Sequence, residues 1–331
     1  MSLDDYPRGF ACVVGAPRCG TTSLSRYLAR HPQICFASVK EPHFFAQSDL
    51  SDLPEAELRD LVEHEYLERF FAHCADRDAV MMEGSVSYLY AAERMQAILR
   101  LWPQAKFIIA LRDPLRMIPS LHQRLLYTGD ETEADFARAW RLIGARRAGR
   151  KIPRTCLDPR LLDYEEIGRL GKHVAAFFAA VGRERCHIVI HDDLVADPGA
   201  AYRGVLAFLG LPDDGRRKFG AKRAGQGFKL GWLQRALKRP PERTRTLLAG
   251  KQFRQRVKSL DGKKAKAGPS PLAEAILGLR KRLLRWNKAP AEPIRVPPDL
   301  RAEIRDTLAA DIDQLGTLIG RDLGHWLGRR G

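Results

Sequence analysis

Apolar residues occur along this chain in two patterns, short continuous runs and longer stretches in which they recur every three or four positions. The continuous runs predict strands buried on both faces, and the wider spacing is typical of amphipathic helices. The predicted strands are 10–14, 34–37, 79–83, 106–111 and 187–191. The predicted helices are 23–30, 54–74, 91–101, a helix that starts near 115, 168–181, 200–209, 272–286 and 300–318.

Predicted strands and helices alternate up to about Asp213. This order indicates an α/β fold, with a P-loop-like, largely parallel sheet flanked by helices. The pattern then changes, because residues 216–270 are basic and poor in strand signals. The chain has no internal repeat, and 331 residues can form one large domain. We therefore expect a single domain over 8–331, in which 215–290 is a basic helical and loop segment, either an insertion or a lid.

Positive charge is concentrated in one part of the chain. Residues 216–266 hold 18 Lys or Arg and two acids, a difference of +16 that equals the formal net charge of the whole protein. Such a concentration favours anionic partners, although an ordinary solvated basic face would give the same count. Apolar residues among these cations, near Trp232 and in 279–286, leave open a peripheral contact with an anionic membrane.

The chain shows no signal for export or for a metal site. No apolar run approaches the roughly 20 residues that cross a bilayer, and MSLDDYPRGF lacks the basic start of a signal peptide. We therefore expect a cytoplasmic protein, with any membrane contact at the inner face. The six cysteines form no CxxC pair, so we expect reduced cysteines and no zinc.

The strongest motif is GAPRCGTT at 15–22, placed between a predicted strand and a predicted helix. Its two glycines allow a tight loop whose N–H groups can surround an anion at the helix start. In nucleotide triphosphatases a lysine follows the second glycine, whereas here Thr21 has that place and Arg18 supplies the cation. A P-loop kinase, or a non-catalytic protein that binds a nucleotide or an anionic polymer, remains an alternative.

This loop, extended to GAPRCGTTSL, resembles the 5′-phosphosulfate loop of sulfotransferases that use 3′-phosphoadenosine 5′-phosphosulfate (PAPS). A second segment, FIIALRDPLRMIPS, carries Arg112 and Ser120 where that family binds the 3′-phosphate. Residues 164–212 and the C-terminal IGRDLGHWL are also similar to the family, the latter to its bacterial members. The resemblance implies PAPS as donor and no required metal. The donor-binding residues that it implies are Arg18, Cys19, Gly20, Thr21, Thr22, Ser23, Arg112, Ser120, Tyr164, Lys222 and Arg223.

The segment KEPHFF at 40–45 resembles a motif of carbohydrate and heparan-type sulfotransferases, in which the glutamate is the catalytic base. The resemblance assigns that role to Glu41. His43 is the rival base, because imidazole is suited to proton transfer near neutral pH, and Lys40 is a candidate helper at the sulfuryl oxygens. Arg18 has the place of the family's loop lysine. A departure follows in EGSVSYLY, where Gly84 has the place of a further lysine.

The same motif bears on the acceptor. It implies transfer to a hydroxyl or an amine, with a carbohydrate or a glycolipid as the favoured acceptor. Nucleic acid is not expected as a partner, because aromatic residues do not alternate with the cations and no nucleic-acid module is recognisable.

Overall fold

The computed structural model describes residues 2–75, 77–220, 226–238, 271–290 and 294–329. Its contacts divide the chain into two compact units. The first unit comprises 1–114, 169–222 and 309–331, and the second comprises 115–168 and 223–308. The expectation of one domain over 8–331 therefore stays a prediction. Much of the basic segment 215–290 lies outside the described residues.

A five-stranded parallel sheet forms the centre of the first unit, in the order β2-β3-β1-β4-β5. The strands are β1 (Gly9–Gly15), β2 (Ile34–Phe36), β3 (Val80–Glu83), β4 (Lys106–Leu111) and β5 (Cys186–Ile190). In the central register, Val13 pairs with Ile108, and both strands are almost wholly buried. This sheet confirms the predicted α/β fold. It also confirms the five predicted strands, each within one or two residues of its predicted ends.

Helices flank both faces of this sheet. In chain order they are α1 (Thr21–Leu28), α2 (Phe44–Gln47), α3 (Glu55–Val62), α4 (Glu68–Phe70), α5 (Gln96–Leu101), α10 (Leu170–Val181), α11 (His191–Ala196), α12 (Pro198–Leu209) and the C-terminal half of α17 (Pro298–Ile319). Short helical turns are η1 (Leu3–Asp5), the π-helical η2 (Glu63–Leu67), η3 (Ala72–Cys74), η4 (Val86–Tyr90), η5 (Ala92–Met95), η7 (Arg183–Arg185) and η8 (Gly324–Leu327). The predicted helix 54–74 is thus a broken series of turns.

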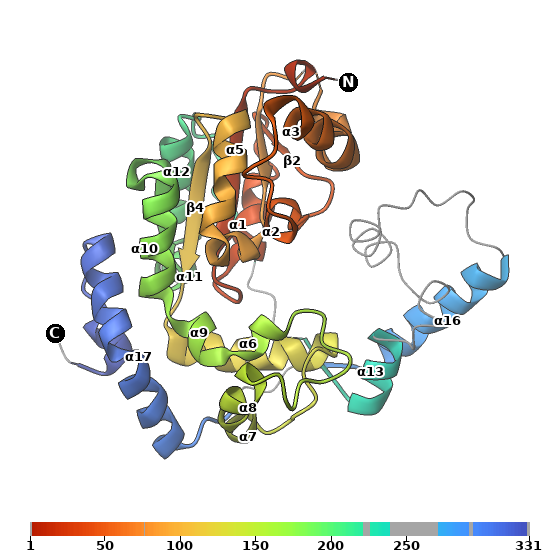
Figure 1. Ribbon diagram of the computed structural model, residues 1–331, viewed down its shortest axis with the longest axis vertical. Helices are drawn as coiled ribbons and strands as arrows, with labels where there is room; N and C mark the ends of the chain where they lie inside the picture. The colour runs from red at the N-terminus through yellow and green to blue at the C-terminus, as the bar shows by residue number, and fades with distance from the viewer. Residues whose placement is uncertain (1, 76, 221–225, 239–270, 291–293, 330–331) are drawn as a thin grey trace. The chain divides into compact units, whose positions relative to one another are not determined.

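Alternating side chains of the strands build two apolar layers. Ala11 and Val13 of β1 belong to the cluster that packs against α1 and α12. On β4, the ring of Phe107 packs against Phe177 of α10, with 5.3 Å between the ring centroids. Figure 1 shows α5 and α10 beside β4. Burial on both faces explains why these strands read as continuous apolar runs.

The C-terminal segment supports the helices next to the sheet. The carboxylate of Asp311 in α17 accepts hydrogen bonds from the N–H groups of Gly171 (2.7 Å) and Lys172 (2.9 Å), at the start of α10. A Cβ at Gly171 would lie 2.3 Å from the carbonyl oxygen of Asp311, so this approach requires glycine. Arg321 then forms a bidentate ion pair with Asp193 of α11. The Arg321 ion pair thus ties the IGRDLGHWL segment to α11.

The second unit consists mainly of helices. They are most of α6 (Pro114–Thr128), α7 (Phe136–Arg141), α8 (Ile143–Arg147), η6 (Pro159–Leu162), α9 (Tyr164–Gly168), α13 (Gly231–Lys238), α16 (Pro271–Trp286) and the start of α17; an antiparallel pair, β6 (Gln226–Phe228) and β7 (Lys288–Pro290), accompanies them. Its buried polar centre is the ion pair between Glu131 and Arg146 at 2.8 Å, with the Tyr164 hydroxyl donating to Glu131 at 2.7 Å.

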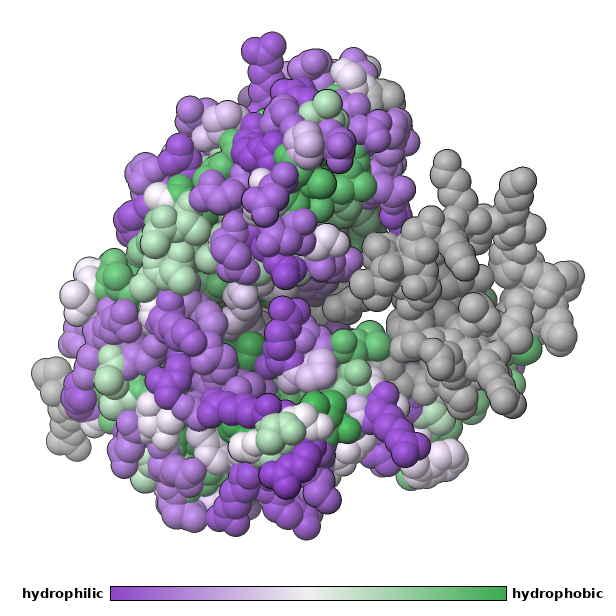
Figure 2. Space-filling model, in the orientation of Figure 1, coloured by the Kyte–Doolittle hydropathy of each residue, from purple (hydrophilic) through white to green (hydrophobic). Residues whose placement is uncertain are grey.

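The surface of the molecule is mostly polar in the view of Figure 2. Among the residues that the structure describes, no helix combines the length and the apolar character needed to cross a bilayer. The longest helix, α17, is amphipathic, with Leu300, Ile304 and Leu308 on its buried side.

The prediction that all six cysteines are reduced is wrong for two of them. Cys35 in β2 and Cys74 in η3 form a disulfide, although 39 positions separate them in the sequence. Cys12, Cys19, Cys156 and Cys186 form no disulfide. The spacing gave no signal, because this pair is brought together by the fold and not by a local motif.

Reducing this disulfide should destabilise the protein. A cross-link over this many residues removes enough denatured-state entropy to contribute about 4 kcal/mol on the loop-entropy account. We expect urea unfolding of the reduced protein, or of Cys35→Ser/Cys74→Ser, to show a free energy of unfolding lower by about that amount. Cys156→Ser, which changes a cysteine outside the disulfide, is the control. An unchanged urea midpoint after reduction would contradict the expectation.

Candidate active site

Several of the residues singled out by sequence follow neighbouring strands at one edge of the parallel sheet. The loop 16–20 follows β1, the segment 40–43 follows β2 closely, Gly84 follows β3, and Arg112 follows β4. In parallel α/β sheets the carboxyl ends of the strands form the edge at which ligands bind. The topology thus explains why motifs far apart in the sequence contribute to one site.

Backbone geometry shapes the loop between β1 and α1. Gly15 has φ 131°, and a Cβ there would lie 2.6 Å from the backbone nitrogen of Ala110, so only glycine fits. Gly20 is the N-cap of α1 in the left-handed conformation and provides no side-chain cap. Its carbonyl accepts the N–H groups of Ser23 (2.9 Å) and Leu24 (3.1 Å), which leaves the N–H groups of Thr21 and Thr22 at the helix start as candidate anion ligands.

The side chains of this loop differ in exposure. Arg18 is exposed and has φ 69°, an uncommon left-handed backbone for a residue with a side chain. Thr21 is buried and Thr22 is exposed. Cys19 is fully buried, and burial raises the pKa of its thiol despite the nearby Arg112 and Arg18 charges. Its contribution to binding would therefore come from its backbone and not from the sulfur.

Arg112 joins the strand β4 to this loop. Its Nη1 donates to the carbonyl oxygen of Arg18 at 3.2 Å. Its Nε is buried and has no hydrogen-bond partner among the described residues. A buried, unsatisfied N–H of a guanidinium costs free energy unless an acceptor arrives, and a phosphate is the acceptor that suits its planar geometry. The residues present therefore fit an anionic nucleotide at this edge.

Lys40, Glu41 and His43 form a charged cluster beside the loop. Lys40 Nζ lies 2.5 Å from Glu41 Oε1, and His43 Nε2 lies 3.8 Å from Glu41 Oε2. Burial would raise the pKa of Glu41, but the hydrogen bond from His43 and the charges of Lys40 and His43 outweigh it and hold the pKa well below its usual range. Glu41 is therefore a carboxylate at neutral pH.

A buried hydrogen-bond network centred on Glu83 supports the cluster of Lys40, Glu41 and His43. The carboxylate of Glu83 accepts from the hydroxyls of Tyr66 (2.8 Å), Tyr88 (2.5 Å) and Ser85. Ser85 Oγ in turn accepts from the N–H of His43 at 2.9 Å. Burial raises the pKa of Glu83, although the three hydroxyl donors oppose the shift. Of these residues, only His43 was predicted from the sequence to take part in catalysis.

A second contact fixes the imidazole ring. His43 Nδ1 lies 2.7 Å from Ser87 Oγ, so one ring nitrogen faces a hydroxyl and the other faces Glu41. Nδ1 donates to Ser87 Oγ in one tautomer of the imidazole and accepts from it in the other. The arrangement suits a histidine that orients and polarises a neighbouring carboxylate.

Gly84, at the position where the resemblance implied a lysine, lies close to Ser25 and Lys40. A Cβ at Gly84 would lie 2.8 Å from Ser25 Oγ and 3.7 Å from Lys40 Cε. The ammonium of Lys40 donates to the Gly84 carbonyl at 3.3 Å. The ammonium of Lys40, from the loop after β2, thus lies beside Gly84, the position without a lysine of its own. Ser25 was not predicted, and its buried Oγ has no hydrogen-bond partner among the described residues.

Four predicted ligands are not among the described residues of the first unit. Ser120 on α6 and Tyr164 on α9 belong to the second compact unit. Tyr164 is fully buried and its hydroxyl donates to Glu131, which already satisfies that donor. Lys222 and Arg223 lie outside the described residues. The roles of these four residues at the donor stay predictions.

Comparison with known proteins shows the family to which the chain belongs. The profile of the sulfotransferase family matches residues 11–215, which include the loop, the charged cluster and Arg112. The match spans more than half of the chain, so this protein belongs to the sulfotransferase family. Among curated proteins no match was found.

Solved structures share the fold. A sulfotransferase from Alicyclobacillus acidocaldarius is 24% identical, with a TM-score of 0.60 over 97% of this chain and 98% of that one. A sulfotransferase domain from the curacin biosynthetic pathway is 15% identical, with a TM-score of 0.43 over 92% and 98%. A mouse sulfotransferase complexed with PAP is 17% identical, with a TM-score of 0.38 over 64% and 63%. The first likeness supports the fold, and the other two scores are too low to support an inference.

Proposed function

We propose that this sulfotransferase moves a sulfuryl group from PAPS to a hydroxyl or an amine of its acceptor. The main support is the buried, unsatisfied Nε of Arg112 beside a loop with an uncapped helix start. The family resemblance assigns the 3′-phosphate of the donor to this arginine. A nucleotide with phosphates on the 3′ and 5′ oxygens of its ribose would supply one acceptor for the Arg112 N–H and another for the N–H groups at the start of α1.

The residues of the cluster then have distinct roles in the transfer. Glu41 accepts the proton of the acceptor hydroxyl or amine as the new bond to sulfur forms. The bond between sulfur and the bridging oxygen of the donor breaks, and Arg18 neutralises the charge that stays on the phosphate. Lys40 interacts with the sulfuryl oxygens, in the place of the lysine that Gly84 replaces. The products are the sulfated acceptor and 3′,5′-adenosine diphosphate (PAP).

The pH dependence of the rate distinguishes Glu41 from His43 as the base. Because the pKa of Glu41 is lowered, its carboxylate stays ionised as the pH falls below neutrality, and the base is lost only in strong acid. We expect kcat/KM to remain flat on the acid side, from about pH 7.5 down to about pH 5. An acid limb within this range that disappears in His43→Gln would assign the base to the imidazole instead.

A carbohydrate or a glycolipid is the acceptor that we propose. The KEPHFF resemblance supports the carbohydrate part. The lipid part is supported by Trp232 and Trp286, which are 64% and 55% exposed, and by Lys229, whose Nζ lies 5.2 Å from the Trp286 ring centroid. Amphipathic basic helices of this kind bind at anionic membrane surfaces.

Two assays test these proposals. Incubation with radiolabelled PAPS and parallel panels of glycans, glycolipids and phenols should transfer label to the first two classes. Co-sedimentation with phosphatidylglycerol vesicles, but not with phosphatidylcholine vesicles, should decrease in Trp232→Ala/Trp286→Ala. Transfer of label to phenols alone would overturn the proposal of a carbohydrate or glycolipid acceptor. Equal binding to both vesicle types would overturn the proposal that the protein binds an anionic membrane surface.

A further inference from the structure

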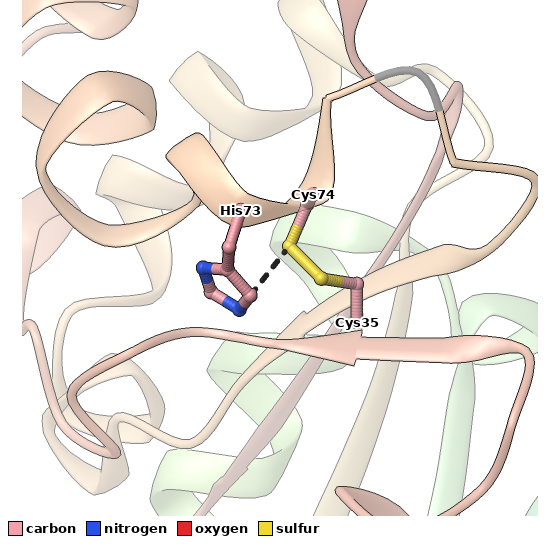
Figure 3. A group of neighbouring side chains, drawn as sticks. All are labelled: Cys35, His73 and Cys74. Carbon is pink, nitrogen blue, oxygen red and sulfur yellow. Dashed lines mark hydrogen bonds between the residues drawn. A yellow bond between two sulfur atoms is a disulfide. The ribbon is translucent and has the colours of Figure 1, made fainter.

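A cluster of three metal-ligating side chains lies outside the sulfotransferase site. Cys35 at the edge of the sheet and Cys74 in η3 form the disulfide, and His73 precedes Cys74 directly. Figure 3 shows the imidazole beside the sulfur of Cys74. Both cysteines are buried, whereas His73 is exposed. Access from solvent to this cluster is therefore through the imidazole.

The distances in this cluster suit a tetrahedral metal. His73 Nε2 lies 3.6 Å from Cys74 Sγ, and the ligand atoms of all three residues lie within 4.8 Å of one another. On tetrahedral zinc, with bonds of about 2.3 Å to sulfur and 2.0–2.1 Å to nitrogen, a nitrogen and a sulfur ligand are about 3.6 Å apart and two sulfurs about 3.8 Å apart. His73 and Cys74 already have the required spacing, whereas the two sulfurs would have to separate.

The neighbours of the sulfurs also suit a metal site. Arg77 Nη1 lies 3.5 Å from Cys35 Sγ, and His73 Nε2 lies 3.6 Å from Cys74 Sγ. The thiolate is the form of cysteine that binds metal. Two thiolates and a neutral imidazole would balance the charge of a divalent ion, so Arg77 would not face a net positive site. Nε2 of His73 also lies 3.1 Å from the Phe36 carbonyl, a contact that metal binding would replace.

We propose that reduction converts this disulfide into a binding site for a thiophilic divalent metal such as Zn²⁺. The step takes two electrons and two protons from a dithiol, which becomes a disulfide in exchange, and gives thiols at Cys35 and Cys74. Metal binding then releases the two thiol protons and uses His73 as the third ligand, with the fourth position left to water. This proposal does not depend on the donor or the acceptor of sulfuryl transfer.

A metal bound by Cys35, His73 and Cys74 would keep β2 attached to η3, close in sequence to the charged cluster of Lys40 and Glu41. β2 leads directly into the segment with Lys40 and Glu41, and Ser38 N–H donates to the Phe70 carbonyl at 2.9 Å. The disulfide joins the same two stretches of chain, 34–38 and 70–74. A metal bound after reduction would therefore replace one cross-link between them by another.

Cobalt titration of the full-length protein tests the site, because Co²⁺ bound by thiolates has a charge-transfer band and tetrahedral d–d bands. After reduction and removal of the reductant without oxygen, we expect one equivalent to bind and Zn²⁺ to displace it. The oxidised protein should show no band. His73→Ala, which keeps the disulfide for folding, should weaken binding at least tenfold, as should Cys35→Ser.

Matched controls come from the same chain. His64→Ala changes an exposed histidine nine positions before His73, and Cys156→Ser changes a cysteine that forms no disulfide; both variants should bind Co²⁺ like the unchanged protein. Zn²⁺ should also restore part of the thermal stability lost on reduction, but not in His73→Ala. The absence of a stoichiometric thiolate band, or a band that His73→Ala leaves unchanged, would overturn the proposal.

Discussion

Glu41→Gln should lower kcat for sulfuryl transfer by about 10²- to 10⁴-fold, the range that a positioned general base contributes. The amide keeps the shape of the side chain and its contact with Lys40, but it cannot take up the acceptor proton. Because the contacts of Glu41 are with Lys40 and His43, and we assign the donor phosphates to Arg112 and the start of α1, the affinity for PAP should stay within about twofold. Initial rates and calorimetry on the same preparation measure both quantities.

Glu65→Gln is the matched control for this variant. Glu65 also pairs with a cation, Arg69, at 2.5 Å, and its side chain is 46% exposed compared with 39% for Glu41. We expect its kcat to equal that of the unchanged protein. If Glu41→Gln kept full activity while His43→Gln lost it, the base would be His43 and the assignment of Glu41 would be wrong.

Arg112→Ala should weaken PAP binding by about 10- to 100-fold, since hydrogen bonds to charged groups contribute about 1.5–3 kcal/mol each. The guanidinium has a buried Nε without a partner and contacts the loop carbonyl of Arg18, so its removal also loosens the loop. Binding of 5′-AMP, which lacks the 3′-phosphate, should change much less. The preference for PAP over AMP should therefore disappear in this variant.

Arg8→Ala serves as the control for Arg112→Ala. Arg8 is exposed and precedes β1 at the end of the strand opposite the loop. Its removal takes away the same charge without touching the proposed site, and PAP affinity should not change at moderate salt. An equal loss in both variants would mean that PAP binds through net charge alone.

Much of the fold could be predicted because buried parallel strands leave a clear pattern. The run KFIIAL gives the bounds of β4 as the structure has them, Lys106–Leu111. The glycine loop was recognisable because Gly15 and Gly20 meet backbone requirements that the sequence expresses directly. Helices α7 and α8 were not predicted, since each spans six residues or fewer and provides little periodicity.

The supporting residues of the site could not be predicted in the same way. Glu83 reads as the end of an apolar strand, and its partners Tyr66 and Tyr88 come from separate turns. The place of Lys40 against Gly84 depends on how the loops after β2 and β3 meet. The disulfide likewise depends on packing between β2 and η3. Such contacts require the three-dimensional arrangement, because no local spacing encodes them.

The most direct test of the proposed donor site is calorimetric titration of the unchanged protein with PAP and, in parallel, with 5′-AMP at moderate salt. We predict one PAP site per chain and a clear preference for PAP, because the 3′-phosphate is the group that Arg112 would hold. Equal affinity for the two nucleotides, or no binding of either, would contradict the proposed donor site.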